Sequence, residues 1–224
     1  MKVICLSGGM DSTVLAYKLK HEGEELYSLT FHYGQSHYCE TLAAKRIADA
    51  LGIPNKLIDF QPVVGRGQNA LTGGEGSPVV PNRNATMLSL AVTYAEGIGA
   101  TEVHYCPTKE DFELFPDCRP DFVAAFNAML EVSESRATVF APFINMSKGE
   151  IAVLGSKLGV PFGETWSCYA GGEEPCGVCL ACQTRSVTDC TDTTMWWNFV
   201  WRLIDLIVTG WFRISQTSLN RYRH

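Results

Sequence analysis

Short apolar runs alternate with longer segments of helical spacing through the first two thirds of this 224-residue chain. Runs bounded by Gly, Pro or Asn predict strands or extended segments at residues 2–6, 25–32, 55–60, 102–106 and 138–143. Apolar residues at helical spacing predict helices at residues 11–20, 38–51, 84–98, 120–132 and 148–158. Because helices join parallel strands through right-handed crossovers, the alternation predicts an open α/β sheet covered on both faces. In such sheets, ligands bind at the carboxyl ends of the strands.

The composition excludes several classes of function. Hydrophobic residues make up 46% and charged residues 19% of the chain, as in an ordinary soluble globular protein. The formal net charge of −6 disfavours broad attraction to nucleic acid, so we expect no stable nucleic-acid complex. The first residues lack the pattern of a secretory signal, and nine cysteines in such a chain indicate reduced thiols. We therefore expect a cytoplasmic protein.

A glycine-rich loop follows the first predicted strand and opens the first predicted helix. It consists of Leu6, Ser7, Gly8, Gly9, Met10, Asp11, Ser12 and Thr13. Adjacent glycines let main-chain N–H groups face outward, and the helix N-terminus adds partial positive charge, so the loop predicts a phosphate or pyrophosphate site. Its spacing is neither that of the Walker P-loop nor G-x-G-x-x-G. A tight turn with a capping Asp11 or Ser12 is the alternative interpretation.

Four of the nine cysteines lie in one short stretch with the spacing C-x7-C-x2-C-x2-C. They are Cys168, Cys176, Cys179 and Cys182. Four thiolates at this spacing surround one tetrahedral Zn²⁺ and leave no open position for a catalytic water. We therefore expect a structural zinc site in a small, loop-rich C-terminal subdomain. An iron–sulfur cluster is the alternative that the same residues allow.

The glycine-rich loop and several further motifs resemble known families. The segment SGGMDS resembles the pyrophosphatase loop of ATP-using enzymes such as GMP synthetase, asparagine synthetase and tRNA-thiolating enzymes. Within this group, the chain resembles the 7-cyano-7-deazaguanine synthases. The matching segments, in order, are SGGMDST (7–13), FHYGQ (31–35), VPNRN (80–84), DF..FPDCR (111–119), APFINMSKGEI (141–151), TWSCY (165–169) and CGVCLACQTRS (176–186). The resemblance implies a Rossmann-like, doubly wound parallel sheet of the pyrophosphatase-loop type at residues 1–162, followed by the zinc subdomain at residues 163–190.

The activity that the resemblance implies is that of an ATP-dependent ligase in queuosine or related deazaguanine biosynthesis. Such enzymes convert 7-carboxy-7-deazaguanine and ammonia to the nitrile through an adenylated carboxylate and an amide, with ATP and Mg²⁺. We expect free ammonia as the nitrogen source, because no Cys–His or Ser–His pairing indicates a glutaminase. The alternatives are an enzyme that stops at the amide or transfers the deazaguanine to a macromolecule, a tRNA-thiolating enzyme, and a zinc-binding nucleic-acid module whose loop is vestigial.

The resemblance also implies roles for charged residues in binding and catalysis. Arg83 and Arg119 are expected to neutralise a substrate carboxylate or phosphate by bidentate donation. Lys148 is expected to stabilise charge that develops on the α-phosphate or on the leaving oxygen. Asp11 is expected to take part in catalysis with Lys148 and Arg119. A surface ion pair is the alternative for each of these side chains.

Three further residues are assigned to recognition of a guanine-like base by the same resemblance. Asp111 is expected to accept hydrogen bonds from the ring N–H and exocyclic amine, and Phe112 or Phe115 to stack on the face of the base. Core packing is the alternative for both aromatic rings. The chain departs from the family at Ser36, where relatives carry Arg, and at residues 107–110, where relatives carry Cys-Glu-Thr.

Residues 191–224 fall outside the resemblance. The segment Met195–Phe212 is dense in Trp, Leu, Ile and Val, and its polar residues recur at a spacing that predicts a helix with one narrow polar stripe. The segment is slightly short for a membrane span and contains two charges. We expect it to be buried against the enzyme or across a homodimer, and contact with a membrane is the alternative.

Overall fold

The computed structural model describes residues 1–35, 39–61, 70–72, 79–168, 174–179 and 182. The strands are β1 Lys2–Cys5, β2 Leu26–His32, β3 Asn55–Asp59, β4 Glu102–His104 and β5 Thr138–Phe140. They form one five-stranded parallel sheet in the order β3-β2-β1-β4-β5. Its register places Val3 of β1 opposite Tyr27 of β2 and Val103 of β4. This sheet confirms the predicted α/β architecture.

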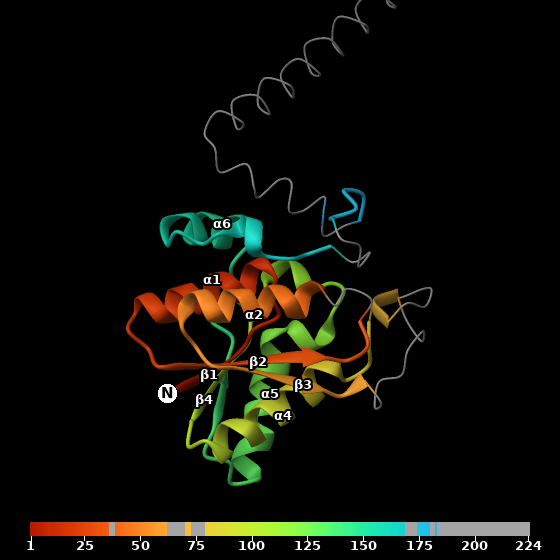
Figure 1. Cartoon of the computed structure of the whole chain (residues 1–224). Helices are drawn as coiled ribbons and strands as arrows, with labels where there is room; N and C mark the ends of the chain where they lie inside the picture. The colour runs from red at the N-terminus through yellow and green to blue at the C-terminus, as the bar shows by residue number, and fades with distance from the viewer. Residues whose placement is uncertain (36–38, 62–69, 73–78, 169–173, 180–181, 183–224) are drawn as a thin grey trace, which may run out of the picture.

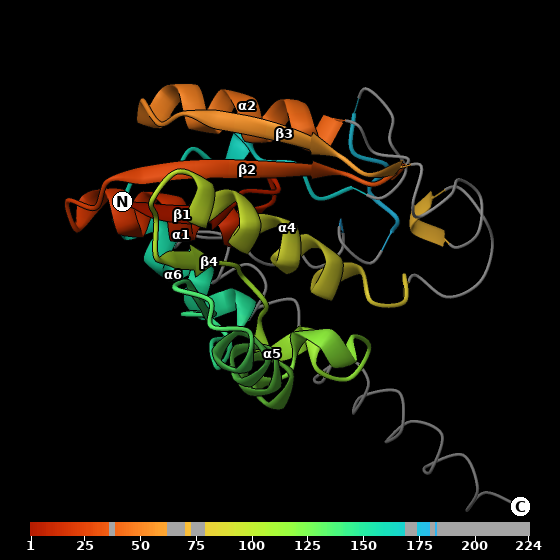
Figure 2. The same cartoon turned by 90° about the horizontal axis from the view of Figure 1, so that it is seen from below.

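Helices join the strands and cover both faces of the sheet. The α-helices are α1 Met10–His21, α2 Cys39–Leu51, α4 Arg83–Gly97, α5 Pro120–Val132 and α6 Lys148–Lys157. Short 3-10 helices lie at Ala70–Thr72 (η1), Lys109–Asp111 (η2), Pro116–Cys118 (η3) and Phe162–Glu164 (η4). One face of the sheet carries α1 and α2, with α6 packed outside α1, and the other face carries α4 and α5 (Figures 1 and 2). The sheet is therefore doubly wound.

The central strand β1 is apolar from Val3 onward because both of its faces are covered there. Val3 and Cys5 belong to the core that α4 and α5 complete. Ile4 and Leu6 belong to the core on the opposite face, with α1, α2 and α6. A strand buried on both sides has no polar face, which explains why the sequence shows a continuous apolar run there rather than an alternating one.

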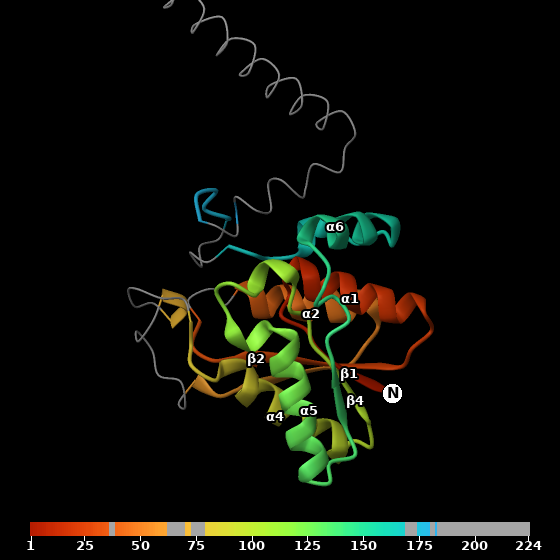
Figure 3. The ribbon, with the colours of Figure 1, turned by 180° about the vertical axis from the view of Figure 1, so that it is seen from behind.

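The direction of winding reverses between β1 and β4. From β1 the chain winds outward through β2 to the edge strand β3, and it then returns to place β4 on the other side of β1. The chain leaves β1 into α1 on one face and leaves β4 toward α5 on the opposite face (Figure 3). Loops that diverge in this way leave a crevice at the carboxyl ends of the two strands, where ligands bind in sheets of this type.

The predicted strands and helices up to residue 158 are all present, with ends that differ by a few residues. The 3-10 helices were not predicted, because short local hydrogen bonds rather than apolar periodicity create them. In η2, for example, Asp111 Oδ2 accepts from the N–H and the hydroxyl of Thr108, at 2.9 Å each. No helix within the described ranges is long and apolar enough to cross a membrane. The predictions for Ser36 and for residues 191–224 lie outside the described residues.

Candidate active site

The phosphate loop, residues 6–13, is the sharp turn by which β1 passes into α1. Gly8 has a φ of +86°, in the left-handed region that favours glycine. A Cβ at Gly8 would lie 2.3 Å from the carbonyl oxygen of Glu40 and 2.6 Å from the main-chain nitrogen of Ala44, both on α2. Only glycine therefore allows the phosphate loop to pack this closely against α2.

Side-chain hydroxyl groups stabilise the phosphate loop through hydrogen bonds inside the loop. The N–H of Ser7 donates to Ser12 Oγ at 3.2 Å, and the two serine hydroxyls lie 3.0 Å apart. The carbonyl oxygen of Gly9 accepts from the hydroxyl of Thr13 at 2.8 Å. The N-cap of α1 is Gly9 and no described side chain caps it, so the alternative of a turn capped by Asp11 or Ser12 is not what the structure shows. The N–H groups of the first turn of α1 are left available to an anion.

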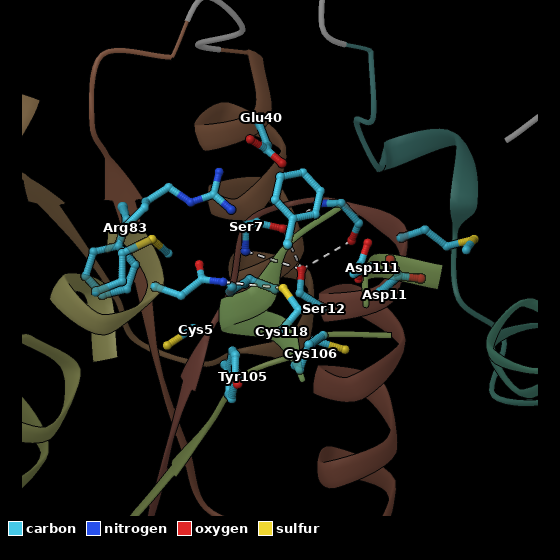
Figure 4. A pocket seen from close by; sticks show the side chains of 18 of the residues that line it. Cys5, Ser7, Asp11, Ser12, Glu40, Arg83, Tyr105, Cys106, Asp111 and Cys118 are labelled. Atoms are coloured by element: carbon cyan, nitrogen blue, oxygen red, sulfur yellow. Dashed lines mark hydrogen bonds between the residues drawn. The ribbon is translucent and has the colours of Figure 1, made fainter. Parts of the chain in front are cut away.

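A cavity of about 300 Å³ opens at the carboxyl ends of β1 and β4 (Figure 4). Its lining residues include Ser7, Gly9, Asp11, Ser12, Tyr33, Arg83, Tyr105, Asp111, Phe115, Lys148 and Trp166. In Figure 4, Arg83 lies on one side of Ser7, and Asp11 and Asp111 lie on the other. The cavity therefore has two charged ends with the phosphate loop between them.

Asp11, Asp111 and Lys148 form the acidic end of the cavity. Lys148 Nζ lies 3.9 Å from Asp111 Oδ1. Asp11 Oδ1 is buried without a hydrogen-bond partner among the described residues. Burial raises the pKa of Asp11 to about 6; Lys148 opposes this rise, and Asp111 and Glu110 add to it. A buried carboxylate oxygen without a partner is the kind of atom that a bound cation or water satisfies.

Arg83 forms the basic end of the cavity, between two aromatic rings. Its guanidinium carbon lies 5.3 Å from the centroid of the Tyr33 ring and 5.9 Å from that of Phe115. Its Nη1 donates to the Tyr33 hydroxyl at 3.3 Å. Its Nε is buried and has no hydrogen-bond partner among the described residues. A buried guanidinium with an unused donor beside a cavity is arranged to receive an anionic group.

Three thiols line the cavity between its charged ends (Figure 4). Burial raises the pKa of Cys5 and of Cys118 to about 12. Burial, with Asp11 and Asp111 nearby, also raises the pKa of Cys106 well above its ordinary value. All three are therefore thiols at neutral pH, and none is activated as a thiolate nucleophile.

The four predicted metal ligands converge in the structure. Their Sγ atoms all lie within 4.8 Å of one another, and those of Cys176 and Cys182 are 4.0 Å apart. Bonds of about 2.3 Å to a tetrahedral zinc place sulfurs roughly 3.8 Å apart, so the set fits such an ion.

Main-chain N–H groups donate to two of these sulfurs, those of Cys168 and Cys176, whereas burial raises the pKa of Cys182 to about 12. The N–H of Cys176 donates to Cys168 Sγ at 3.2 Å, and the N–H of Cys179 donates to Cys176 Sγ at 3.4 Å. Hydrogen bonds from the main chain of Val178 and Cys179 lower the pKa of Cys176 to about 6. Hydrogen bonds of this kind stabilise the thiolate form, which is the form that binds metal.

Most of the predicted site residues line the same cavity. These are Leu6, Ser7, Gly9, Met10, Asp11, Ser12, Arg83, Asp111, Phe115 and Lys148. Gly8 packs against α2 instead, and Thr13 is buried behind the phosphate loop. Arg119 and Phe112 do not line the cavity: Arg119 Nε donates to the carbonyl oxygen of Phe112 at 2.8 Å. Their contacts with a substrate stay predictions.

Several lining residues had no predicted role. They include Tyr33, Gln35, Glu40, Tyr105, Cys106 and Trp166. Tyr33 and Gln35 lie in the segment FHYGQ, and Trp166 lies in TWSCY, so membership of a motif was the available signal. Tyr105 and Cys106 follow β4 directly, and knowledge of the strand order would have indicated them, because the cavity lies where the winding reverses.

Together, these features define a class of protein. A doubly wound parallel sheet, a Ser-Gly-Gly loop that opens α1 where the winding reverses, and a cavity bounded by that loop are the features of a nucleotide-binding pyrophosphatase-loop enzyme. The four converging cysteines add a metal-ligand set.

Comparison with known proteins identifies the family. The family model described as "Queuosine biosynthesis protein QueC" matches residues 1–188. A curated 7-cyano-7-deazaguanine synthase of Archaeoglobus fulgidus is 41% identical over 199 residues, which cover 82% of this chain and 83% of that protein. A synthase of the same name from Caldicellulosiruptor saccharolyticus is 38% identical over 197 residues, covering 82% and 88%. The chain therefore belongs to the QueC family of enzymes.

Solved structures of more distant proteins share the fold. The U34-tRNA thiolase NcsA from Methanococcus maripaludis aligns with a TM-score of 0.51 and 17% identity, over 96% of this chain and 72% of that chain. A predicted subunit of tRNA methyltransferase from Methanocaldococcus jannaschii aligns with a TM-score of 0.52 and 17% identity, over 70% and 74%. At this identity the similarity concerns the fold alone.

Proposed function

We propose that this enzyme is an ATP-dependent ligase that converts 7-carboxy-7-deazaguanine and ammonia to 7-cyano-7-deazaguanine, in queuosine or related deazaguanine biosynthesis. The observation that carries the proposal is that the phosphate loop and Arg83 border one cavity of about 300 Å³. Adenylation requires a carboxylate beside the α-phosphate of a nucleotide, and a shared cavity supplies that proximity. Membership of the QueC family supports the assignment.

The residues of the cavity have separable tasks in this reaction. The N–H groups of the phosphate loop and of the first turn of α1 bind the phosphates of ATP. Arg83 binds the substrate carboxylate through its unused donors, and Lys148 stabilises the charge that develops at the α-phosphate. Phe115 stacks on the deazaguanine, and Asp111 accepts from its N–H groups.

Magnesium fits the acidic end of the cavity. Asp11 offers a buried Oδ1 that no described residue satisfies, and Asp111 lies close enough to raise the pKa of Asp11. Carboxylate oxygens of this kind are the ligands that Mg²⁺ takes together with phosphates. When bound, the ion would neutralise charge on the triphosphate.

Zinc is the metal that we propose for the four-cysteine set. Four thiolates complete a tetrahedral shell, so the ion has a structural role and no position for a reacting water. Burial raises the pKa of the described thiols of the active-site cavity, which favours ammonia over a cysteine thiolate as the nucleophile. We further propose a cytoplasmic homodimer, in which a second copy covers exposed apolar side chains such as Val132.

Oxygen labelling tests the proposed reaction. Purified enzyme would receive 7-carboxy-7-deazaguanine with both carboxylate oxygens replaced by ¹⁸O, together with ammonium and MgATP. Each activation transfers one substrate oxygen to AMP, so the nitrile and two singly labelled AMP molecules are expected by mass spectrometry. An unlabelled AMP would contradict adenylation, and an amide with only one labelled AMP would identify an enzyme that stops at the amide.

A further inference from the structure

One hydrogen bond joins the segment before the cysteines to the phosphate loop. The main-chain N–H of Trp166 donates to the carbonyl oxygen of Gly8 at 2.9 Å. Trp166 is buried and also lines the cavity. The two residues belong to opposite ends of the described chain, so only the tertiary structure brings them together.

This hydrogen bond determines which way the peptide unit between Gly8 and Gly9 faces. The described chain has no cis peptide bond, and in a trans peptide the C=O and N–H groups point in opposite directions. Holding the Gly8 carbonyl at Trp166 therefore directs the Gly9 N–H away from Trp166. The Gly9 N–H donates instead to Ser7 Oγ, with an N···O distance of 3.2 Å, and both residues line the cavity.

The peptide unit between Gly8 and Gly9 needs a directional contact because it has a glycine on each side. Without side chains, Gly8 and Gly9 have little intrinsic preference between the two orientations of the peptide. Contacts with α2 confine Gly8 on one side, where a Cβ would lie 2.3 Å from the Glu40 carbonyl oxygen. The Trp166 N–H then provides the directional contact that selects one orientation.

Trp166 is itself held by the cysteine cluster. Its indole Nε1 donates to the carbonyl oxygen of Cys168 at 3.0 Å. Its ring packs in a small buried cluster with Cys168, Cys182 and Ala43 of α2. Two of the four predicted metal ligands therefore pack in the same buried cluster as Trp166.

We propose that the metal-bound cysteine cluster positions the phosphate loop through Trp166, so that metal binding and nucleotide binding are coupled. Trp166 is a positioning residue: its main-chain N–H fixes the Gly8–Gly9 peptide in the orientation that lets the Gly9 N–H donate to Ser7 Oγ on the cavity side of the phosphate loop. The inference rests on the proposed nucleotide site but not on the identity of the final product. Its test therefore measures nucleotide binding and loop exchange rather than product formation.

A matched pair of variants isolates the main-chain N–H. Trp166→Ala removes the indole but keeps the N–H, whereas Trp166→Pro removes both. The preceding residue accommodates a proline at this position, because Thr165 is extended, with φ −84° and ψ 155°. The Kd of MgATP, measured by calorimetry on metal-loaded protein, should rise roughly tenfold to a hundredfold from Trp166→Ala to Trp166→Pro, as for a lost hydrogen bond that orients a donor to a charged group. Trp166→Phe, which keeps an aromatic ring and the main-chain N–H but loses the indole donor to Cys168, should restore most of the affinity of the wild type.

Removal of the metal from the wild-type protein tests the same coupling without a substitution. After chelation, amide hydrogen exchange of the peptide that contains residues 7–12 should accelerate, while exchange of β2 stays unchanged. The Kd of MgATP, measured after the chelator is removed, should rise, and readdition of zinc should restore both values. Unchanged exchange and an unchanged Kd in the metal-free protein would overturn the proposal, as would equal affinities of Trp166→Ala and Trp166→Pro.

Discussion

Arg83 and Tyr33 form one unit in the wall of the cavity. The guanidinium carbon lies 5.3 Å from the centroid of the Tyr33 ring, and Nη1 donates to the hydroxyl of the same residue at 3.3 Å. Removing a cation from water is unfavourable unless a charge or a polar group compensates it. No described carboxylate lies within ion-pair distance of Arg83. Burial opposes the charged form, whereas Tyr33 and Asp117 favour it and leave the pKa of Arg83 raised. The contacts with the aromatic rings offset part of the free-energy cost of burying the guanidinium. An anionic ligand in the cavity would offset more of it.

The two arginines that the sequence suggested for anion binding should behave differently when each is replaced by glutamine. Arg83→Gln should raise the KM for 7-carboxy-7-deazaguanine by roughly tenfold to a hundredfold, because a charged hydrogen-bond donor to the carboxylate is lost. Arg119→Gln should chiefly lower the melting temperature, because the observed contact of Arg119 is with the carbonyl oxygen of Phe112. Steady-state kinetics and thermal denaturation of both variants check this. An equal rise in KM for Arg119→Gln would instead place Arg119 at the substrate.

Gly8→Ala should abolish nucleotide binding, whereas Gly159→Ala should not. Both glycines have positive φ, +86° and +70°, so both substitutions carry a strain of about 1 kcal/mol. Only at Gly8 would the new Cβ also meet α2, 2.3 Å from the Glu40 carbonyl oxygen, while nothing lies within 4 Å at Gly159. Calorimetric titration with MgATP and thermal denaturation separate the two effects. A Gly8→Ala protein that binds MgATP normally would show that the close packing on α2 is dispensable.

The pKa of Asp11 predicts a pH dependence of stability in the absence of Mg²⁺ and nucleotide. The native pKa is raised from 3.8 to about 6, so between these values the native state binds a proton that the unfolded state has released. The free energy of unfolding should therefore fall as pH rises from about 4 to about 6, by about 3 kcal/mol at most from this group. Asp11→Asn should remove this slope and should also reduce turnover by orders of magnitude. Denaturant unfolding at a series of pH values measures the slope, and equal slopes in both proteins would contradict the assignment.

Cys176→Ser should release the metal, whereas Cys39→Ser should retain it. Cys176 belongs to the converging set of sulfurs, and Cys39 packs against the same cluster without being a member of that set. Elemental analysis should find one zinc per chain in the wild type and in Cys39→Ser, and less than one in Cys176→Ser. Stoichiometric iron with visible absorption would identify a cluster in place of zinc.

Local patterns were sufficient for the order and type of the main elements. The apolar run before Ser7 predicted β1, and regular apolar spacing predicted α4 and α5, because these patterns record which faces of each segment are buried. The spacing of the four cysteines predicted their convergence for a similar reason. When few residues separate the ligands in sequence, few backbone conformations are possible between them. The structure brings all four sulfurs within 4.8 Å of one another.

The sequence by itself thus determined an α/β chain with a phosphate loop after the first strand and a four-cysteine metal-ligand set. Only the tertiary structure decided the strand order, which places the carboxyl ends of β1 and β4 side by side and so locates the cavity. It also separated Arg83, at the cavity, from Arg119, held at the carbonyl oxygen of Phe112. The contact between Gly8 and Trp166 was equally beyond local patterns. Periodicity reports the burial of a residue within its own element, whereas such contacts depend on how distant elements pack across the sheet.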